Sequence, residues 1–90
     1  MSGTFDVRYT ATAVKQIRKL DKSAQARILG AVEILREAPR PPASKQLVGG
    51  DGERRVRTGD YRIVYEVHDE ELVVLVIQVG HRREVYRQHG

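Results

Sequence analysis

Two residues, Gly59 and Asp60, constrain the fold more than any other part of the chain, because a strand pattern lies on each side of them. A glycine in the first position of a two-residue loop is typical of the tight turn of a β-hairpin. Such a loop fixes the strand register, which begins by pairing Thr58 with Tyr61. The sequence therefore predicts an antiparallel hairpin with a defined set of cross-strand neighbours.

This register sorts the side chains of the hairpin onto two faces, because successive residues of a strand point to opposite sides of a sheet. The apolar face carries Val56, Tyr61, Ile63, Tyr65 and Val67. The opposite face carries Arg55, Arg57, Arg62, Val64 and Glu66. We therefore expect one face to pack in the core and the other to be cationic.

A nearly continuous apolar segment, residues 72–79, predicts the next strand and a central place for it in the sheet. We expect residues 69–71 to form a three-residue loop before it. The core face would then carry Val73, Leu75, Ile77 and Val79. The arginine face would carry Val74, Val76, Gln78, Gly80 and Arg82. In this register Gln78 lies beside Arg62, and Val64 floors a concave surface with Val74 and Val76.

The first part of the chain predicts a strand followed by a basic helix. Apolar residues alternate with polar ones at Phe5, Val7 and Tyr9, as in a half-buried strand. Thr10 or Thr12 can cap the helix that follows. Its apolar positions are spaced by three residues at Val14, Ile17 and Leu20.

A second helix follows so closely that the two must form an antiparallel hairpin. Asp21 or Ser23 can cap it, and its apolar stripe contains Ala24, Ile28, Ala31 or Val32, and Leu35. It ends at three prolines, Pro39, Pro41 and Pro42. The predicted fold is therefore α+β: an N-terminal strand, a helix hairpin and a three-stranded antiparallel meander, with both helices on one face of a four-stranded sheet.

The composition limits the class of protein. The chain has 90 residues, which is the length of one domain spanning residues 1–90, and it has no cysteine for a disulfide or a thiolate metal site. Its three histidines are scattered, so we expect neither a metal nor another cofactor. The N-terminus has no signal-peptide pattern, and no apolar run approaches the roughly 20 residues of a membrane span. We expect a soluble, cytoplasmic protein without a membrane partner.

The arginine face indicates a site for phosphate. The net charge is +4 and the sequence pI is about 9.8, which suits a polyanionic partner. Arg57 opposite Arg62 is a like-charge pair that destabilises a sheet by some tenths of a kcal/mol. A simpler interpretation is that nearby carboxylates neutralise a solvated face, namely Glu53, Asp60, Glu66 and Glu84. We favour phosphate binding, because the planar guanidinium matches phosphate with two hydrogen bonds.

The order of these elements and four short segments closely resemble the RelE family of bacterial and archaeal toxins. The segments are R-V-R at 55–57, G-D-Y-R-I-V-Y-E-V at 59–67, V-G-H-R at 79–82 and E-V-Y at 84–86. The resemblance covers essentially the whole chain. It implies a toxin of a type II toxin–antitoxin system, a ribosome-dependent endoribonuclease that cuts messenger RNA in the ribosomal A site and so inhibits translation.

The resemblance also implies partners and a mechanism. The partners are a RelB-like antitoxin, the 30S decoding site with its ribosomal RNA, and operator DNA reached only through the antitoxin complex. In the metal-free reaction, the ribose 2′-hydroxyl attacks the adjacent phosphate. By position, Arg55 and Arg57 match two residues that are often lysines in the family, and Arg62 its phosphate-contacting arginine. Arg82 and Tyr86 match its second catalytic arginine and its terminal tyrosine.

The two arginines at the lysine positions leave the proton transfers without an obvious residue, because arginine keeps its proton above pH 12. His81 is a candidate acid or base. The alternative for His81 is a strand-end residue, and its parity directs it to the core side. Tyr86 could stack on a base or simply pack on the sheet.

Other cations could contact ribosomal RNA or be solvated: Arg83, Arg87 and, on the first predicted helix, Lys15, Arg18 and Lys19. Arg55 could bind RNA as well as serve in the reaction. Two alternative functions remain, a ParE-like inhibitor of DNA gyrase and a non-catalytic module that binds RNA or protein. The first would not need the arginine array.

Overall fold

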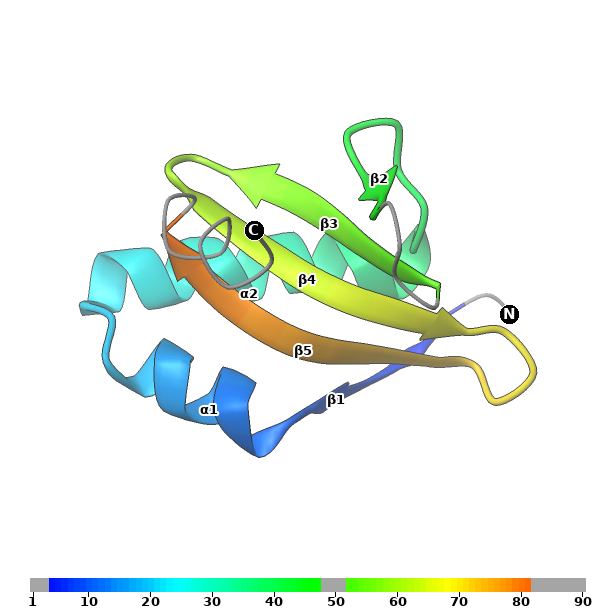
Figure 1. Ribbon diagram of the computed structural model, residues 1–90, viewed down its shortest axis with the longest axis horizontal. Coiled ribbons are helices and arrows are strands. Elements are labelled where there is room, and N and C mark those ends of the chain that lie inside the picture. The colour runs from blue at the N-terminus through cyan, green and yellow to red at the C-terminus, as the bar shows by residue number, and fades with distance from the viewer. Residues whose placement is uncertain (1–3, 48–51, 82–90) are drawn as a thin grey trace.

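A five-stranded sheet with two helices on one face forms the protein in the computed structural model, which describes residues 4–47 and 52–81 (Figure 1). The elements are β1 (Asp6–Tyr9), α1 (Ala11–Arg18), α2 (Lys22–Glu37), β2 (Lys45–Gln46), β3 (Glu53–Thr58), β4 (Tyr61–His68) and β5 (Val73–His81). The strand order is β1-β5-β4-β3-β2, in which β1 and β5 are parallel and the other neighbours are antiparallel. The α+β class and the antiparallel helix pair are as predicted.

Side-chain caps begin both helices. The Thr10 hydroxyl accepts a hydrogen bond from the amide of Ala13 at 3.1 Å, so Thr10 rather than Thr12 caps α1. The Asp21 carboxylate accepts from the amide of Ala24 at 2.7 Å, so Asp21 rather than Ser23 caps α2. The three-residue connection between the helices fixes how they enter the core.

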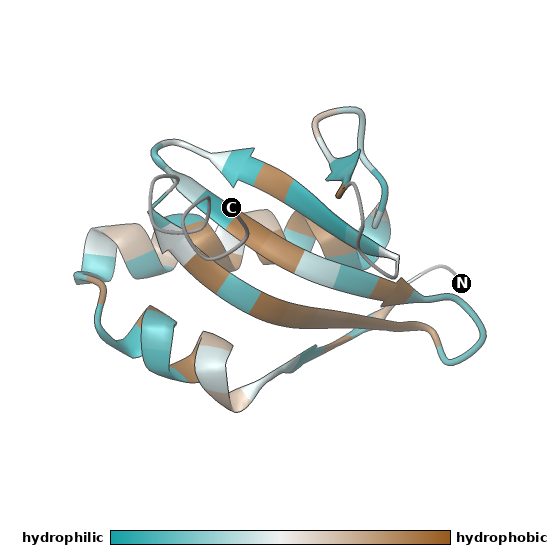
Figure 2. Ribbon diagram, viewed as in Figure 1, coloured by the Kyte–Doolittle hydropathy of each residue, from teal (hydrophilic) through white to brown (hydrophobic). Residues whose placement is uncertain are grey.

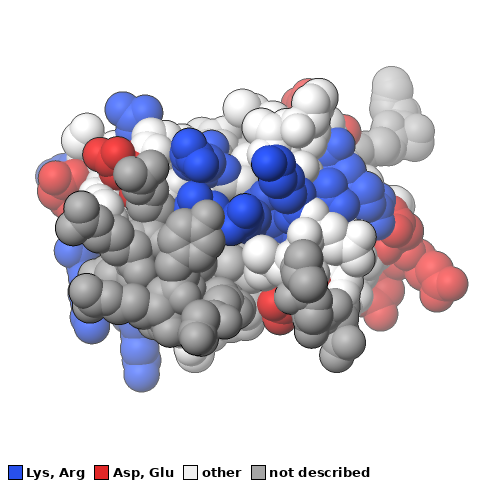
Figure 3. All heavy atoms as spheres, turned by 45° about the horizontal axis from the view of Figure 1, so that its top comes forward, with Lys and Arg blue, Asp and Glu red and all other residues white. Residues whose placement is uncertain are grey.

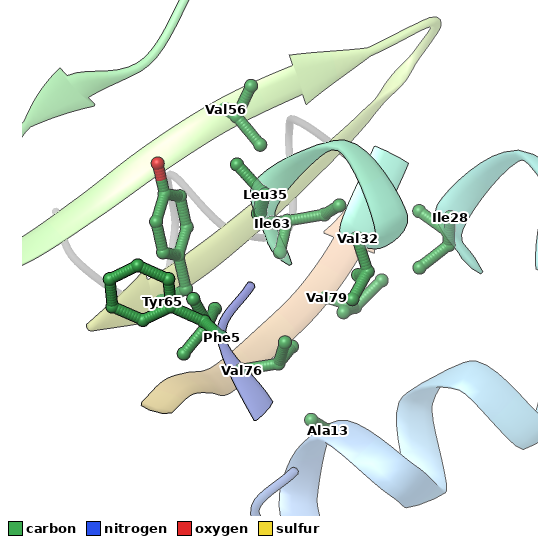
Figure 4. Packing of buried hydrophobic residues seen from close by; sticks show 11 residues of the cluster. Phe5, Ala13, Ile28, Val32, Leu35, Val56, Ile63, Tyr65, Val76 and Val79 are labelled. Atoms are coloured by element: carbon green, nitrogen blue, oxygen red, sulfur yellow. The ribbon is translucent and has the colours of Figure 1, made fainter. Parts of the chain in front are cut away.

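The core lies between the helices and the sheet (Figure 4). From α2 it receives the predicted stripe, with Val32 as the central residue and Ala31 only partly buried. From α1 it receives Ala13, whereas the predicted Val14 is half-buried. Ile17 and Leu20, the other two positions of the predicted stripe, are partly buried and pack against the core. The small side chain of Ala13 suits a helix that lies close to β5. The colours of Figure 2 show the apolar residues concentrated on β4 and β5.

The register predicted for β3 and β4 is confirmed, but the register predicted for the first part of β5 is wrong. Residues 69–72 form the loop, one residue more than expected, because Leu72 adopts a left-handed backbone with φ 55°. His68 therefore pairs with Val73. The core face carries Val74 and Val76 in place of Val73, Leu75 and Ile77, so the two valines do not floor the arginine face.

A β-bulge at Ile77 then reverses the parity of β5. Tyr65 pairs with Val76 but Val64 pairs with Gln78, so Ile77 is an extra residue and the direct partner of Gln78 is Val64 rather than the predicted Arg62. Beyond the bulge the predicted faces are confirmed, with Val79 in the core and Gly80 on the arginine face, but Gly80 rather than Gln78 pairs with Arg62.

Side chains from the α1 segment hold this bulge in place. The Thr10 hydroxyl donates to the carbonyl oxygen of Ile77 at 2.7 Å, and the Gln16 side-chain oxygen accepts from the amide of Val79 at 2.6 Å. Thr10 therefore serves both the cap of α1 and the bulge of β5.

The fifth strand, β2, was not predicted. Lys45 pairs with Arg55 and Gln46 with Arg54, and the amide of Leu47 donates to the carbonyl oxygen of Glu53 at 2.9 Å. A strand of two residues has no detectable periodicity. β2 extends the sheet beyond β3, at the edge next to the strand that carries Arg55 and Arg57.

An ion pair joins the proline segment to the β4–β5 loop. Nη1 and Nη2 of Arg40 donate hydrogen bonds to Oδ1 and Oδ2 of Asp69 at 3.0 and 2.7 Å. This hydrogen bonding lowers the pKa of Asp69 from its ordinary value of 3.8. A lowered pKa stabilises the folded state above pH 3.8, and the contribution is lost as the pH falls through the folded pKa. We expect Asp69→Asn to lower the melting temperature slightly at neutral pH, because exposed pairs contribute little.

Thermal melts of this variant and the wild type should converge below pH 3.8. Glu70→Gln is the matched control, since it removes the same charge from the same loop and Glu70 makes no ion pair within the described residues. An Asp69→Asn difference that persists at acid pH would contradict the assignment.

Candidate functional site

A pocket of about 380 Å³ opens on the face of the sheet opposite the helices. Within the described part of the chain it is lined by Ala43, Lys45, Arg55, Arg57 and Arg62. These residues come from β2, β3, β4 and the segment before β2. Figure 3 shows basic side chains gathered on this side of the molecule. The pocket is thus cationic on almost all of its described wall.

The sheet register places Arg55, Arg57 and Arg62 on one face as predicted, and the fourth predicted arginine, Arg82, lies outside the described residues. Arg57 and Arg62 are direct cross-strand neighbours, and Gly80 follows Arg62 in the same row. In the neighbouring row of cross-strand pairs, Lys45 lies opposite Arg55, and Arg55 lies opposite Val64. Because cross-strand neighbours share a face, the two rows place four cations around one space.

Arg62 differs from the other cations of the pocket, because only 4% of its surface is exposed. Its guanidinium keeps its charge despite burial. A charge that is removed from water is screened less, so its attraction to an anion is stronger than that of an exposed arginine. Arg62 therefore provides a fixed positive group in the pocket wall.

Buried polar contacts hold the segment that carries Lys45. The hydroxyl of Ser44, itself buried, donates to the carbonyl oxygen of Pro41 at 2.8 Å. The same hydroxyl accepts from Nε and Nη2 of Arg54 at 3.2 and 2.9 Å. The hydroxyl of the buried Tyr65 donates to the carbonyl oxygen of Pro39 at 2.6 Å. Arg54, which alternates away from the array, thus anchors the strand that completes it.

Lys45 is the site residue that the sequence interpretation missed. The basic residue stands three positions after the last proline, and no periodicity marks it as part of a strand. The one signal for Lys45 in the sequence is indirect: β3 would otherwise be an edge strand with unpaired backbone groups, so a further strand beside it could have been expected.

His81 lies away from the pocket, on the core side, as its parity predicted. It pairs with Tyr61, and the two rings make an edge contact with centroids 6.0 Å apart. Tyr61 packs against the core, as predicted for it and for Tyr65. His81 is not among the residues that line the pocket.

The remaining predicted residues fall into two groups. Four lie outside the described residues: Arg82, Arg83, Tyr86 and Arg87. Three are exposed on or just after α1: Lys15, Arg18 and Lys19. Since α1 packs on the helix face, these three cations are not brought to the pocket.

The described wall of the pocket suits an oxyanion and includes no carboxylate, imidazole or thiolate that could bind a cation. Three guanidinium groups and one ammonium can donate hydrogen bonds to the oxygens of a phosphate. Within residues 4–47 and 52–81, no three His, Cys, Asp or Glu residues are grouped so that they could hold a metal ion. Within these residues, no helix has the length and the apolar character needed to cross a membrane.

Comparison with known proteins identifies the family. Residues 7–86 match the family described as the ParE toxin of the type II toxin–antitoxin system parDE. Toxin RelG of Mycobacterium tuberculosis is 35% identical over 93% of this chain and 98% of its own length. The mRNA interferase toxin RelE of Escherichia coli K12 is 37% identical over 84% of this chain and 83% of its own length.

Solved structures agree. The toxin–antitoxin complex RelBE2 of M. tuberculosis superposes with a TM-score of 0.81 at 28% identity, covering 91% of this chain and 95% of that one. The isolated RelE toxin of E. coli superposes with a TM-score of 0.76 at 31% identity, covering 94% of each chain. The chain belongs to the RelE/ParE family of toxins of type II toxin–antitoxin systems.

Proposed function

We propose that the protein is a ribosome-dependent endoribonuclease that cleaves messenger RNA in the ribosomal A site and so inhibits translation. The observation that carries the proposal is the cationic pocket, with the buried Arg62 in its wall. The mRNA interferase name of the E. coli relative supports it.

In the proposed reaction the 2′-hydroxyl of a message nucleotide attacks its own 3′-phosphate. The bond from the 2′-oxygen to phosphorus forms as the bond to the 5′-oxygen breaks, which leaves a cyclic phosphate and a 5′-hydroxyl. Negative charge collects on the phosphorane oxygens, where preorganised donors are most effective. Arg55, Arg57 and Arg62 are the donors, and by the family resemblance Arg82 and Tyr86 complete the site.

The composition of the pocket supports dependence on the ribosome in this proposal. It supplies positive charge for a phosphate, but its described wall has little that could orient a flexible single strand. Holding the reacting atoms in line is worth a large part of a barrier of this kind. In this proposal the ribosome, which holds the message in a fixed path, supplies that orientation.

The partner that controls the toxin is, in this proposal, a RelB-like antitoxin. The support is that the M. tuberculosis structure which superposes on this chain is described as a toxin–antitoxin complex. Operator DNA would be bound through the antitoxin in the complex.

Mapping of message ends tests the activity. We expect the purified protein to cut messages on translating ribosomes and to leave the same RNA largely intact when it is free. Cut messages should carry a cyclic phosphate at the 3′ end. Equal cleavage of free and ribosome-bound RNA would refute the ribosome dependence, and no cleavage of either would refute the nuclease.

A second candidate is inhibition of DNA gyrase, because the matching family carries the ParE description. A supercoiling assay separates the two. Inhibition of supercoiling without cleavage of ribosome-bound message would select the gyrase function, and the reverse result selects the nuclease.

A further inference from the structure

We infer that Lys45 is the general acid of this site and donates the proton that the leaving 5′-oxygen requires. The inference rests on the proposed nuclease function. Lys45 lies outside the four segments that carry the family resemblance, and the resemblance gives it no role in the reaction.

The placement of Lys45 is fixed from both sides. On its N-terminal side, Ser44 is bound by Arg54 and by Pro41. On its C-terminal side, the pairing of β2 with β3 continues through Leu47, whose amide binds Glu53. The backbone at Lys45 is therefore held against Arg55, and its side chain reaches the pocket with the arginines.

The chemistry of the pocket singles out this side chain. Arginine does not release its proton under physiological conditions. Of the described residues that line the pocket, three are arginines and one is alanine, which leaves Lys45 as the group able to transfer a proton. The ammonium of a lysine carries three donor hydrogens, and Lys45 is exposed on the pocket wall.

The proton balance of the step is simple. The 2′-hydroxyl loses its proton to water or hydroxide as its oxygen bonds to phosphorus. The electron pair of the breaking bond passes to the 5′-oxygen, which takes a proton from Nζ of Lys45. The neutral amine is then reprotonated by water. The arginines stabilise the phosphorane throughout and transfer no proton.

A message with sulfur in place of the bridging 5′-oxygen at the cleaved position tests this role. A thiolate leaves without a proton, because thiols are far stronger acids than alcohols. Lys45→Arg keeps the charge but not the transferable proton. We expect it to slow single-turnover cleavage of the normal message by at least about 100-fold, and to cleave the sulfur message nearly as fast as the wild type.

Two further variants define the comparison. Arg57→Ala should slow both messages, since it removes charge stabilisation that either leaving group needs. Lys22→Arg, the same change at an exposed position on α2, should alter neither, and melting curves should show that all variants are folded.

The outcomes separate this inference from the proposed function. If the wild type cleaves and Lys45→Arg cleaves the normal message at the same rate, Lys45 supplies charge only and the inference is wrong. If Lys45→Arg slows both messages equally, Lys45 binds or positions and is not the acid. If the wild type itself leaves ribosome-bound message intact, the nuclease proposal fails and this inference fails with it.

Discussion

We expect replacement of Arg62 by lysine to lower the single-turnover rate of the proposed message cleavage on ribosomes by about 100- to 1000-fold, the effect of removing one preorganised donor from a charged transition state. Lysine keeps the positive charge but loses the planar fork that binds two phosphate oxygens at once. The effect is large because Arg62 is buried beside Arg57 and Gly80 and cannot be replaced by a mobile neighbour. End mapping under single-turnover conditions measures it.

Arg8→Lys is the control for this prediction. It is the same substitution at an exposed position of β1, and Arg8 does not line the arginine pocket. We expect cleavage by Arg8→Lys to match the wild type. An Arg62→Lys protein with a wild-type melting curve and wild-type cleavage would remove Arg62 from the reaction.

We expect Ile28→Ala to destabilise the fold by about 2–5 kcal/mol, because it leaves a cavity where α2 meets the sheet. Ile28 is fully buried in the core. A domain of this size has a total stability on the order of 5–15 kcal/mol, so the loss is a large fraction of it. Urea unfolding at equilibrium measures the difference.

The same helix supplies the matched control, Ile34→Ala. Ile34 is 61% exposed, so its replacement should change the free energy of unfolding by less than about 0.5 kcal/mol. Both substitutions replace isoleucine by alanine within α2, so helix propensity cancels between them. Equal effects at the two positions would contradict the core described for α2.

The strand registers that the sequence specifies firmly could be predicted, and those that it specifies weakly could not. Gly59 and Asp60 allow one close turn, so the β3–β4 pairing and its two faces could be predicted. The segment 72–79 is apolar on both faces, so its pattern does not determine which residues face the core. Its parity depends on the backbone of Leu72 and on the bulge at Ile77, which Thr10 and Gln16 stabilise from a distant segment.

The candidate site divides in the same way. Arg55, Arg57 and Arg62 lie on the hairpin whose register the turn specifies, so their common face could be predicted. Lys45 could not, because it lies on a two-residue strand held by Ser44 and Arg54. The roles in the reaction stay predictions for all the catalytic candidates: Arg55, Arg57, Arg62, Arg82, Tyr86 and His81.

The place of β5 in the sheet has a consequence for the synthesis of the protein. β5 is the last described strand along the chain, yet it lies between β4 and β1 and joins the two halves of the sheet. A nascent chain cannot bury its core until residue 81 has been made, and pairing between segments so far apart in sequence is slow to form. During translation of its own message, the native sheet therefore cannot be completed until β5 has been made.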